Sequence, residues 1–366
     1  MRIPLGPPLR RASVSALALA AVCAPGAARA TAPAAAPAPE APRIPFAERY
    51  HVVQRGGIVR AANASASCRT TADDPSEPSC PAARAGRIPA VNGDFDMSYV
   101  DVDDDPHTYN SSRAELRLPE GSQVTYARLY WGGNLLAGER KPAADNGRVL
   151  IAEPGGQYKE LLADTVVGHR TQGGADAFQA SAEITGLVRS NGSGLWTVGQ
   201  VNVAAGRSGP GAWGGWTLVT AYRNPAEPLR TLALWDGFDS LDGATGVRLN
   251  GLRIPRGAEG RAGLVAYNGD RGGTGDSLTY SVAGRTPTPL AGSADPADDV
   301  LNSTINEPGP VGARREPAYD NTLGYDSDVF DLGTALAQSG DQLAFQLVSQ
   351  RDAAWAGALF AAVDVQ

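Results

Sequence analysis

Aspartates that gather in short loop segments are the residues of this sequence whose types and spacing best suit a specific chemistry. The five strongest candidates alternate with other residues in two separate segments: Asp101, Asp103, Asp105, Asp326 and Asp328. Close carboxylates repel one another unless they share a cation, and Ca²⁺ takes about six to eight oxygen ligands. These aspartates are therefore candidate calcium ligands. The helix–loop–helix calcium motif does not fit them, because Pro106 stands where that motif requires glycine.

The same acidic segments have a second interpretation as turns. Asp side chains hydrogen-bond their own backbone a short way along the chain, which makes them common turn residues. Asp270 and Asp276 likewise flank a glycine-rich loop. Calcium binding and turn formation stay open as alternative explanations of these carboxylates, and turn formation is the more common one.

Gly275-Asp276-Ser277-Leu278 matches the signature of a family of secreted hydrolases with a serine nucleophile. That chemistry needs a histidine base within hydrogen-bonding reach of the serine, and an acid that orients the base. No histidine follows His169, so the C-terminal part of that catalytic site is missing. Ser277 is therefore predicted to begin an ordinary strand.

Other catalytic motifs are also missing from the sequence, namely the Gly-x-Ser-x-Gly nucleophile turn, the phosphate-binding loop and the dinucleotide fingerprint. The histidines are widely separated and show no zinc-binding spacing. Paired carboxylates of the kind used by glycoside hydrolases need no local motif. A secreted carboxylate-based glycoside hydrolase is therefore the enzymatic alternative, and no catalytic or cofactor-binding residue is assigned.

Tryptophans offer a different kind of chemistry, because an exposed indole can stack on a sugar ring. Indoles flanked by Leu and Val more commonly fill a core. Core positions are predicted for the tryptophans in or beside predicted strands: Trp131, Trp213, Trp216, Trp235 and Trp355.

The N-terminus predicts export. Three arginines precede an apolar stretch at 12–22 that is too short to span a bilayer, and Ala28-Arg29-Ala30 matches the signal-peptidase pattern. Residues 1–30 are therefore predicted to be a signal peptide, followed by a Pro/Ala linker over 31–43. A lipid anchor at Cys23 is disfavoured, because Val22 stands where a small residue is required.

Removal of the signal peptide leaves a single pair of cysteines, Cys68 and Cys80. An even pair in an oxidising compartment predicts a disulfide. The spacing differs from the Cys-x-x-Cys of metal and redox sites. A bridge of this loop length stabilises a protein by roughly 3 kcal/mol.

Strands must position these residues, because helical periodicity is almost absent from the sequence. Apolar and polar residues alternate over 278–282 and 343–348, the period-two pattern of half-buried strands. The 44 glycines and 27 prolines fall largely between such runs. The sequence therefore predicts an all-β fold of jelly-roll or immunoglobulin-like β-sandwiches.

A faint internal repeat suggests how the chain is divided. The segment 183–221 resembles 330–363, each with an apolar turn, a polar corner, an alternating strand and a Trp-containing final strand. The proline-rich segment 224–228 lies between them, and proline is excluded from central strands. Two tandem sandwiches are therefore predicted, over 44–226 and 227–366.

The composition excludes several classes of protein. The chain has 366 residues, a formal net charge of −7 and 42% hydrophobic residues. The acidic balance argues against a nucleic-acid partner, because phosphate binding needs a basic surface. No apolar run reaches the roughly 20 residues of a transmembrane helix, and the chain is too apolar to be wholly disordered.

Several stretches resemble a domain found in uncharacterised secreted proteins of high-GC Gram-positive bacteria: 97–133, 214–238, 264–276 and 321–332. The resemblance spans most of the chain after the signal peptide. It implies a β-rich extracellular head domain that is often followed by Ig-like repeats and a wall or membrane anchor. This sequence ends at Gln366, directly after the last predicted strand, so free secretion is expected rather than covalent attachment to the cell surface.

Export, a β-rich fold, acidic loops and the missing nucleophile–base pairs together predict a non-catalytic extracellular protein. Its expected partner is a surface polymer, a matrix component or another protein, with calcium as the expected cofactor if the acidic loops bind one. The expected location is extracellular, including association with the cell wall.

Overall fold

The computed structural model describes residues 36–366 except 42–43, 71–77, 242–243, 310–311, 334–335, 337–338 and 351–352. The segment Ala36–Gln366 forms one compact unit. The predicted signal peptide and parts of the predicted linker lie outside the described residues.

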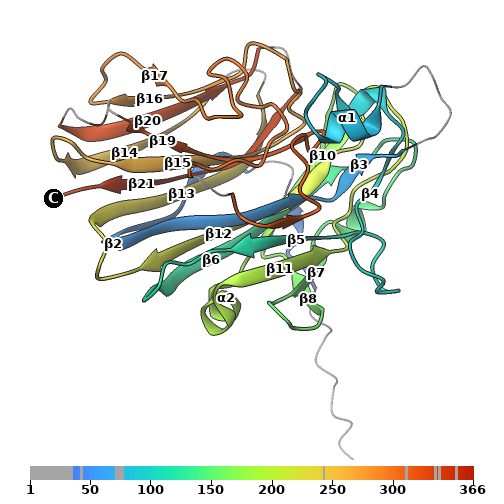
Figure 1. Cartoon of the computed structure of the whole chain (residues 1–366), viewed down its shortest axis with the longest axis horizontal. Coiled ribbons are helices and arrows are strands. Elements are labelled where there is room, and N and C mark those ends of the chain that lie inside the picture. Colours follow the sequence, from blue (N-terminus) through green and yellow to red (C-terminus); the bar gives the residue numbers. More distant parts are fainter. Residues whose placement is uncertain are drawn as a thin grey trace, which may run out of the picture. The chain divides into compact units, whose positions relative to one another are not determined.

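A large, mostly antiparallel sheet runs through the whole unit (Figure 1). In the order given next, the first strand runs parallel to the second, and all other neighbouring strands run antiparallel. In order across the sheet, the strands are β1 (Glu40–Ala41), β9 (Thr165–Gln172), β10 (Ala175–Glu183), β6 (Gln123–Asn134), β12 (Gly214–Arg223), β2 (Ala47–Ala64), β13 (Leu229–Ser240), β21 (Trp355–Asp364), β15 (Gly260–Tyr267) and β19 (Tyr325–Asp331).

Smaller sheets accompany the large one. The first contains β18 (Arg315–Glu316), β5 (Ser111–Leu116), β11 (Gly194–Gly199), β7 (Arg148–Ala152) and β8 (Lys159–Leu162). The second contains β14 (Ala244–Ile254), β20 (Gly340–Val348), β16 (Ser277–Val282) and β17 (Thr288–Pro289). A further pair joins β3 (Ala66–Cys68) to β4 (Met97–Tyr99).

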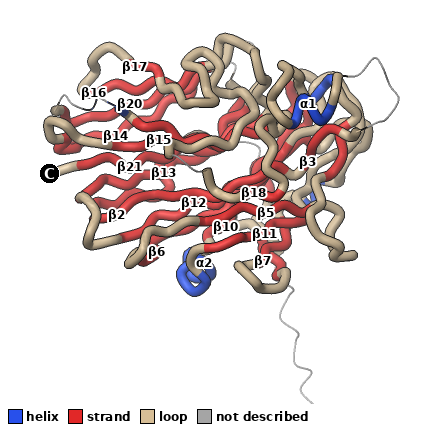
Figure 2. The backbone as a smooth tube through the Cα atoms, in the orientation of Figure 1, coloured by secondary structure: helices blue, strands red, loops and turns tan. Residues whose placement is uncertain are grey.

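Over the described residues, helix is limited to short segments (Figure 2). They include the α-helices α1 (Cys80–Arg84) and α2 (Thr185–Asn191) and the 3₁₀ turns Asn92–Asp94 and Ala143–Asp145. The predicted all-β class is confirmed. The alternating segments at 278–282 and 343–348 form β16 and β20, as predicted.

Each small sheet packs against the large sheet and encloses its own core. In the first core, Trp196 of β11 packs with Trp131 and Trp216 of the large sheet. In the second, Leu343 of β20 packs with Leu359 of β21. The period-two alternation of strands sends Leu129 and Trp131 into the first core, and Tyr130 between them to the opposite face. The four-stranded and five-stranded sheets thus pack on different parts of one large sheet.

The opposite face of the large sheet is rolled around a third core. Four strands lie between β12 and β19 in the sheet, so five interstrand spacings separate them. In a flat sheet, at roughly 4.8 Å per spacing, the two strands would be about 24 Å apart. The hydroxyls of Thr217 on β12 and Tyr325 on β19 nevertheless lie 2.7 Å apart. The sheet therefore curves and encloses large aromatic side chains: Tyr130, Trp213, Phe238, Tyr267, Tyr325 and Trp355.

The division into separate domains at 226/227 is not confirmed. Strand β2 pairs with β12 from the first half of the chain and with β13 from the second half. The proline-containing segment 224–228 is only the connection between these two strands. The halves are therefore joined through the sheet rather than linked end to end.

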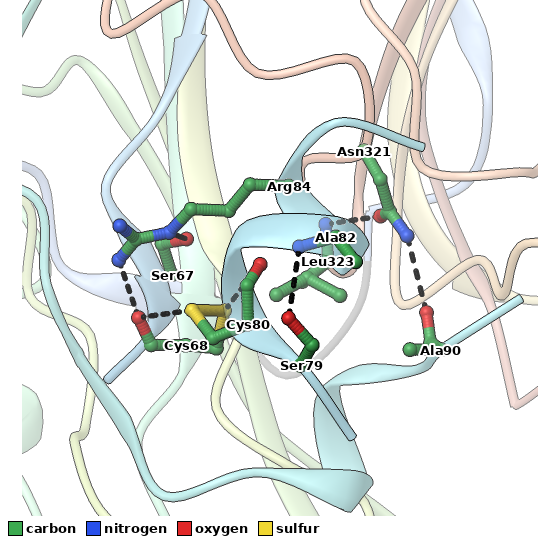
Figure 3. Close-up of a disulfide and its surroundings, with 9 residues drawn as sticks. All are labelled: Ser67, Cys68, Ser79, Cys80, Ala82, Arg84, Ala90, Asn321 and Leu323. Carbon is green, nitrogen blue, oxygen red and sulfur yellow. Dashed lines mark hydrogen bonds between the residues drawn. A yellow bond between two sulfur atoms is a disulfide. The ribbon is translucent and has the colours of Figure 1, made fainter. Parts of the chain in front are cut away.

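The predicted disulfide is present between Cys68 and Cys80 (Figure 3). It joins α1 to the end of β3, and both cysteines are buried in a small apolar core. Arg84 of α1 adds hydrogen bonds to the Ser67 hydroxyl, at 3.0 Å, and to the Cys68 carbonyl. The backbone carbonyl of Arg84 also accepts from the Asp320 N–H at 2.9 Å, so α1 helps hold the segment that precedes β19.

Candidate functional site

A groove of about 660 Å³ lies on the first small sheet. The alternation of β11 creates it, because Trp196 and Val198 point into the core and leave Thr197 on the outer face. Acidic, basic, amide, hydroxyl and small apolar groups all line the groove: Asp103, Asp105, His107, Arg113, Leu150, Ala152, Gly156, Gln157, Tyr158 and Thr197.

Asp103 is the most constrained carboxylate in the groove. Its Oδ2 accepts a 2.7 Å hydrogen bond from the Tyr158 hydroxyl, and its Oδ1 accepts from the Asp105 N–H at 3.2 Å and from the Thr108 hydroxyl at 3.3 Å. Burial would raise the pKa of Asp103, but these hydrogen bonds hold the pKa below its usual range. Asp103 is therefore an ionised acceptor rather than a proton donor at neutral pH.

Arg113 balances the acidic charge of the groove. Its guanidinium lies 3.2 Å from Glu316 and 3.8 Å from Asp103. Pairing of β18 with β5 brings Glu316 beside Arg113. Because Arg113 is shared between two carboxylates, its charge is not free to select an anion. The groove is polar without a strong excess of either charge.

The acidic loop at the groove shows the turn bonding that was one of its two interpretations. Asp101 Oδ1 accepts from the Ser111 hydroxyl at 2.7 Å, and Asp105 Oδ1 accepts from the His107 N–H at 2.9 Å. Together with the bonds to Asp103, these contacts occupy oxygens that a cation would need. Asp101, Asp103 and Asp105 therefore fit calcium poorly as they stand, and calcium at this loop stays a prediction.

Asp326 and Asp328 lie elsewhere, fully buried on β19. They and Asp295 meet at Thr304, whose hydroxyl lies 2.6 Å from Asp295 Oδ1 and 3.0 Å from Asp328 Oδ1. The Thr304 N–H donates to Asp326 Oδ1 at 3.2 Å. Burial, and then the neighbouring carboxylates, raise the pKa of Asp326 and of Asp328 well above the usual range.

Positive charge is also buried beside this second acidic group. Arg60 opposes the rise in the pKa of Asp328, and burial lowers the pKa of Arg315 to about 10. In the described part of the chain, Asp326 Oδ2 and Asp328 Oδ2 have no hydrogen-bond partner, but these arginines already supply cationic charge. Within the described residues, no three His, Cys, Asp or Glu side chains are placed to hold a metal ion. The five predicted calcium ligands thus lie in two groups, and calcium binding by them is untested.

The tryptophan prediction is confirmed. At most 4% of each predicted core tryptophan is exposed, so these indoles pack inside the protein and offer no sugar-stacking surface. Ser277 begins β16, as predicted.

A second hollow, of about 730 Å³, is lined by residues of the large-sheet strands β2, β12, β13, β15, β19 and β21 and of the loops beside them. Four of its five charged side chains are paired with one another: Arg230 with Glu227 at 2.7 Å, and Arg261 with Asp331 at 3.0 Å. The groove on the small sheet instead presents the exposed side chains of His107 and Gln157. It is the better candidate for a binding site.

Sequence reasoning found only Asp103 and Asp105 among the groove residues. It missed Arg113 and Tyr158, which lie on or beside the short strands β5 and β8. A signal for β5 was present, because Ala114 and Leu116 alternate with Arg113 and Glu115. Nothing local indicates that Tyr158 reaches Asp103.

No helix in the described part of the chain is long and apolar enough to cross a membrane. None of the protein-family models, curated proteins or solved structures with which the chain was compared matches it.

Proposed function

We propose that the protein is a non-catalytic extracellular binding protein that holds a neutral polysaccharide in the groove on the first small sheet. The mixture of hydrogen-bonding groups in the groove carries this proposal. The exposed side chains of His107 and Gln157 both line the groove, and an imidazole and an amide can each donate and accept. Sugar hydroxyls also donate and accept, so a hydroxyl-rich chain matches this surface better than an apolar or strongly anionic ligand does.

The protonation state of the carboxyl groups in the groove favours binding over hydrolysis. A glycoside hydrolase needs one carboxyl group that remains protonated to act as the acid, beside a second that is ionised. Hydrogen bonds keep Asp103 ionised. The carboxyls whose pKa is raised, Asp270, Asp299, Asp326 and Asp328, do not line the groove.

The extracellular part of the proposal rests on the signal-like N-terminus and on the disulfide. Disulfides persist mainly in oxidising compartments. The Cys68–Cys80 bridge is consistent with that environment. A polymer outside the cell is accordingly the proposed partner.

Incubation of the protein with insoluble cellulose, chitin and mannan distinguishes binding of a polymer from its hydrolysis. We expect depletion of the protein from solution by at least one of these polymers, without release of reducing sugar ends. The anionic polymer alginate, coupled to beads, serves as the charge control and should retain less protein. Failure to bind any neutral polymer would contradict the proposal, and release of reducing ends would replace it with the glycoside hydrolase.

A further inference from the structure

Two loops meet beside the start of β16, outside the groove. Asp276 and Asp299 form an isolated parallel β-bridge. The backbone around them is closely bonded, since the N–H groups of Gly275 and Asp276 both donate to the Asp298 carbonyl, at 2.7 and 3.2 Å. Paired residues of neighbouring extended segments send their side chains to the same face. The Asp276 and Asp299 carboxylates are therefore side by side.

These carboxylates are buried and largely without partners. Asp276 is 1% exposed and Asp299 is 6% exposed. Among the residues that the structure describes, neither oxygen of Asp276 has a hydrogen-bond partner, and the same is true of Asp299 Oδ1. Asp299 Oδ2 accepts from the Gly272 N–H at 3.0 Å. Three buried carboxylate oxygens are thus left without a proton donor, a situation that native proteins avoid because it is costly.

Neighbouring negative charges make ionisation of the carboxyl groups in this region still less favourable. Burial, and then Asp276 and Asp298, raise the pKa of Asp299 to about 6. Burial, and then Asp94, Asp276 and Asp299, raise the pKa of Asp270 to about 6. Arg271 partly opposes this effect at Asp299, but its guanidinium donates to the Asp320 carbonyl at 3.0 Å.

The aspartates on β19 provide a comparison. Asp328 has a nearby buried arginine and accepts from the Asn306 N–H at 2.8 Å. Asp276 has neither an ion pair nor a side-chain hydrogen bond within the described residues. The uncompensated negative charge of this region is therefore concentrated at the Asp276–Asp299 bridge.

We propose that Asp276 and Asp299 bind a divalent cation, and that the cation is calcium. Both side chains offer oxygen, the ligand of Ca²⁺ and Mg²⁺, whereas zinc and copper sites use His or Cys. The pair provides two carboxylates, and main-chain carbonyl and water oxygens complete the shell, as Ca²⁺ readily accepts. Asp270 contributes charge nearby. Mg²⁺ requires a stricter octahedral geometry and binds more weakly at a site of this kind.

Bound calcium would tie the loop before β16 to the loop that contains Asp299. A ligand that binds only the folded state must raise its stability. Calcium should therefore raise the midpoint of thermal unfolding by roughly 5 °C when its concentration is about a hundredfold above Kd. Calorimetric titration with CaCl₂ should give a single site.

The test compares unfolding in EDTA and in CaCl₂ for the wild type, Asp276→Asn and Asp103→Asn. We expect Asp276→Asn to lose the calcium-dependent shift and to be at least as stable as the wild type in EDTA, because the substitution removes a like-charge contact. Asp103→Asn, at the groove, should keep the full shift. Asp299→Asn is the second variant if Asp276→Asn does not fold. No shift in the wild type, or a full shift in a folded Asp276→Asn or Asp299→Asn protein, would overturn the proposal.

Discussion

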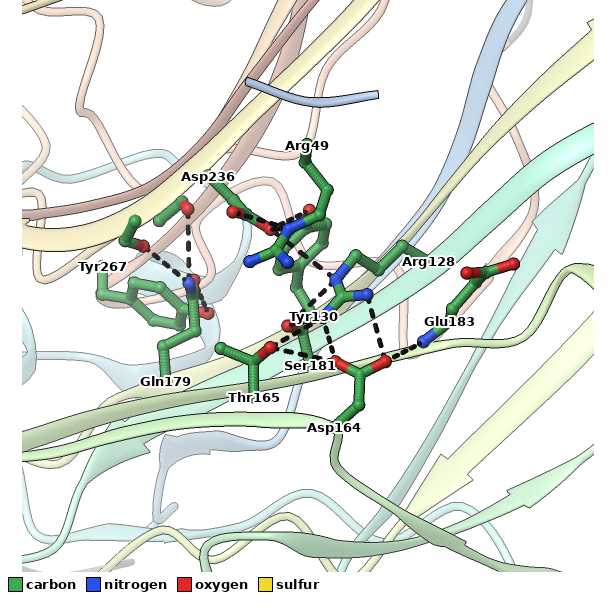
Figure 4. Close-up of polar contacts among 12 residues, drawn as sticks. Arg49, Arg128, Tyr130, Asp164, Thr165, Gln179, Ser181, Glu183, Asp236 and Tyr267 are labelled. Atoms are coloured by element: carbon green, nitrogen blue, oxygen red, sulfur yellow. Dashed lines mark hydrogen bonds and ion pairs between the residues drawn. The ribbon is translucent and has the colours of Figure 1, made fainter. Parts of the chain in front are cut away.

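Replacing Asp236 with alanine is expected to lower the free energy of unfolding by about 3–5 kcal/mol. Asp236 lies on β13 and is 4% exposed. The Arg49 Nε–H is shared between its two carboxylate oxygens, at 3.0 and 2.9 Å, and the Tyr130 hydroxyl donates to the carboxylate at 2.8 Å (Figure 4). Arg128 Nε lies 3.6 Å away and is also buried. The substitution would leave the buried Arg128 guanidinium without this neighbouring negative charge, and the buried Tyr130 hydroxyl without its acceptor.

The same network explains why the effect should be global. Arg128 of β6 also pairs with Asp164 and donates to the Ser181 hydroxyl of β10. Gln179 of β10 donates to the Gly237 carbonyl of β13 at 2.9 Å and accepts from the Tyr267 hydroxyl at 3.0 Å. These contacts cross the interior of the rolled sheet and join strands from both halves of the chain.

Urea unfolding measures the predicted loss. Asp331→Ala is the matched control, because Asp331 pairs with Arg261 at 3.0 Å but both side chains are more than half exposed. An exposed pair contributes at most about 1 kcal/mol. Similar losses in the two variants would show that the Asp236 network does not hold the rolled sheet together.

Removing the disulfide should have the next largest effect. The double variant Cys68→Ala/Cys80→Ala is expected to lose about 3 kcal/mol, the value for closing a loop of this length. Replacing both cysteines avoids leaving a free thiol. Arg84 and its contacts to Ser67 and Cys68 would remain, so we expect weaker attachment of α1 rather than a changed fold.

Urea unfolding with and without reductant checks this prediction. The wild type in reductant should match the double variant, and reductant should leave the double variant unchanged. A wild type that keeps its full stability after verified reduction would contradict the assigned role of the bridge.

Local patterns predicted those parts of the fold that depend on local chemistry. Apolar and polar residues alternate clearly in strands β16 and β20, because one face of each strand is more exposed to solvent. The Leu and Val residues that flank the tryptophans correctly predicted their place in the core. Strand β10, Ala175–Glu183, is buried on both faces and rich in alanine, so it shows no alternation to detect. Pairing partners far apart in sequence carry no such signal. For that reason the sequence did not show that β2 joins the two halves.

The acidic residues show the same limit. Asp103 and Asp326 look alike in sequence, since each stands in a short run of alternating aspartates. In the structure Asp103 caps a turn at a groove, whereas Asp326 is buried on β19, the last strand of the large sheet, beside Thr304. The difference comes from segments that are distant in sequence, and only the fold brings these segments together. The Asp276–Asp299 bridge was missed for the same reason.

The groove on the first small sheet is proposed to bind a neutral polysaccharide. The most direct test measures binding of whichever of cellulose, chitin or mannan retains the protein, using His107→Ala/Gln157→Ala and the matched control His51→Ala/Gln346→Ala. All four side chains are exposed, but only the first pair lines the groove. We predict about tenfold weaker binding for the groove variant, as expected when a few contact residues carry most of the binding energy, and unchanged binding for the control. Equal binding by the two variants would contradict the claim.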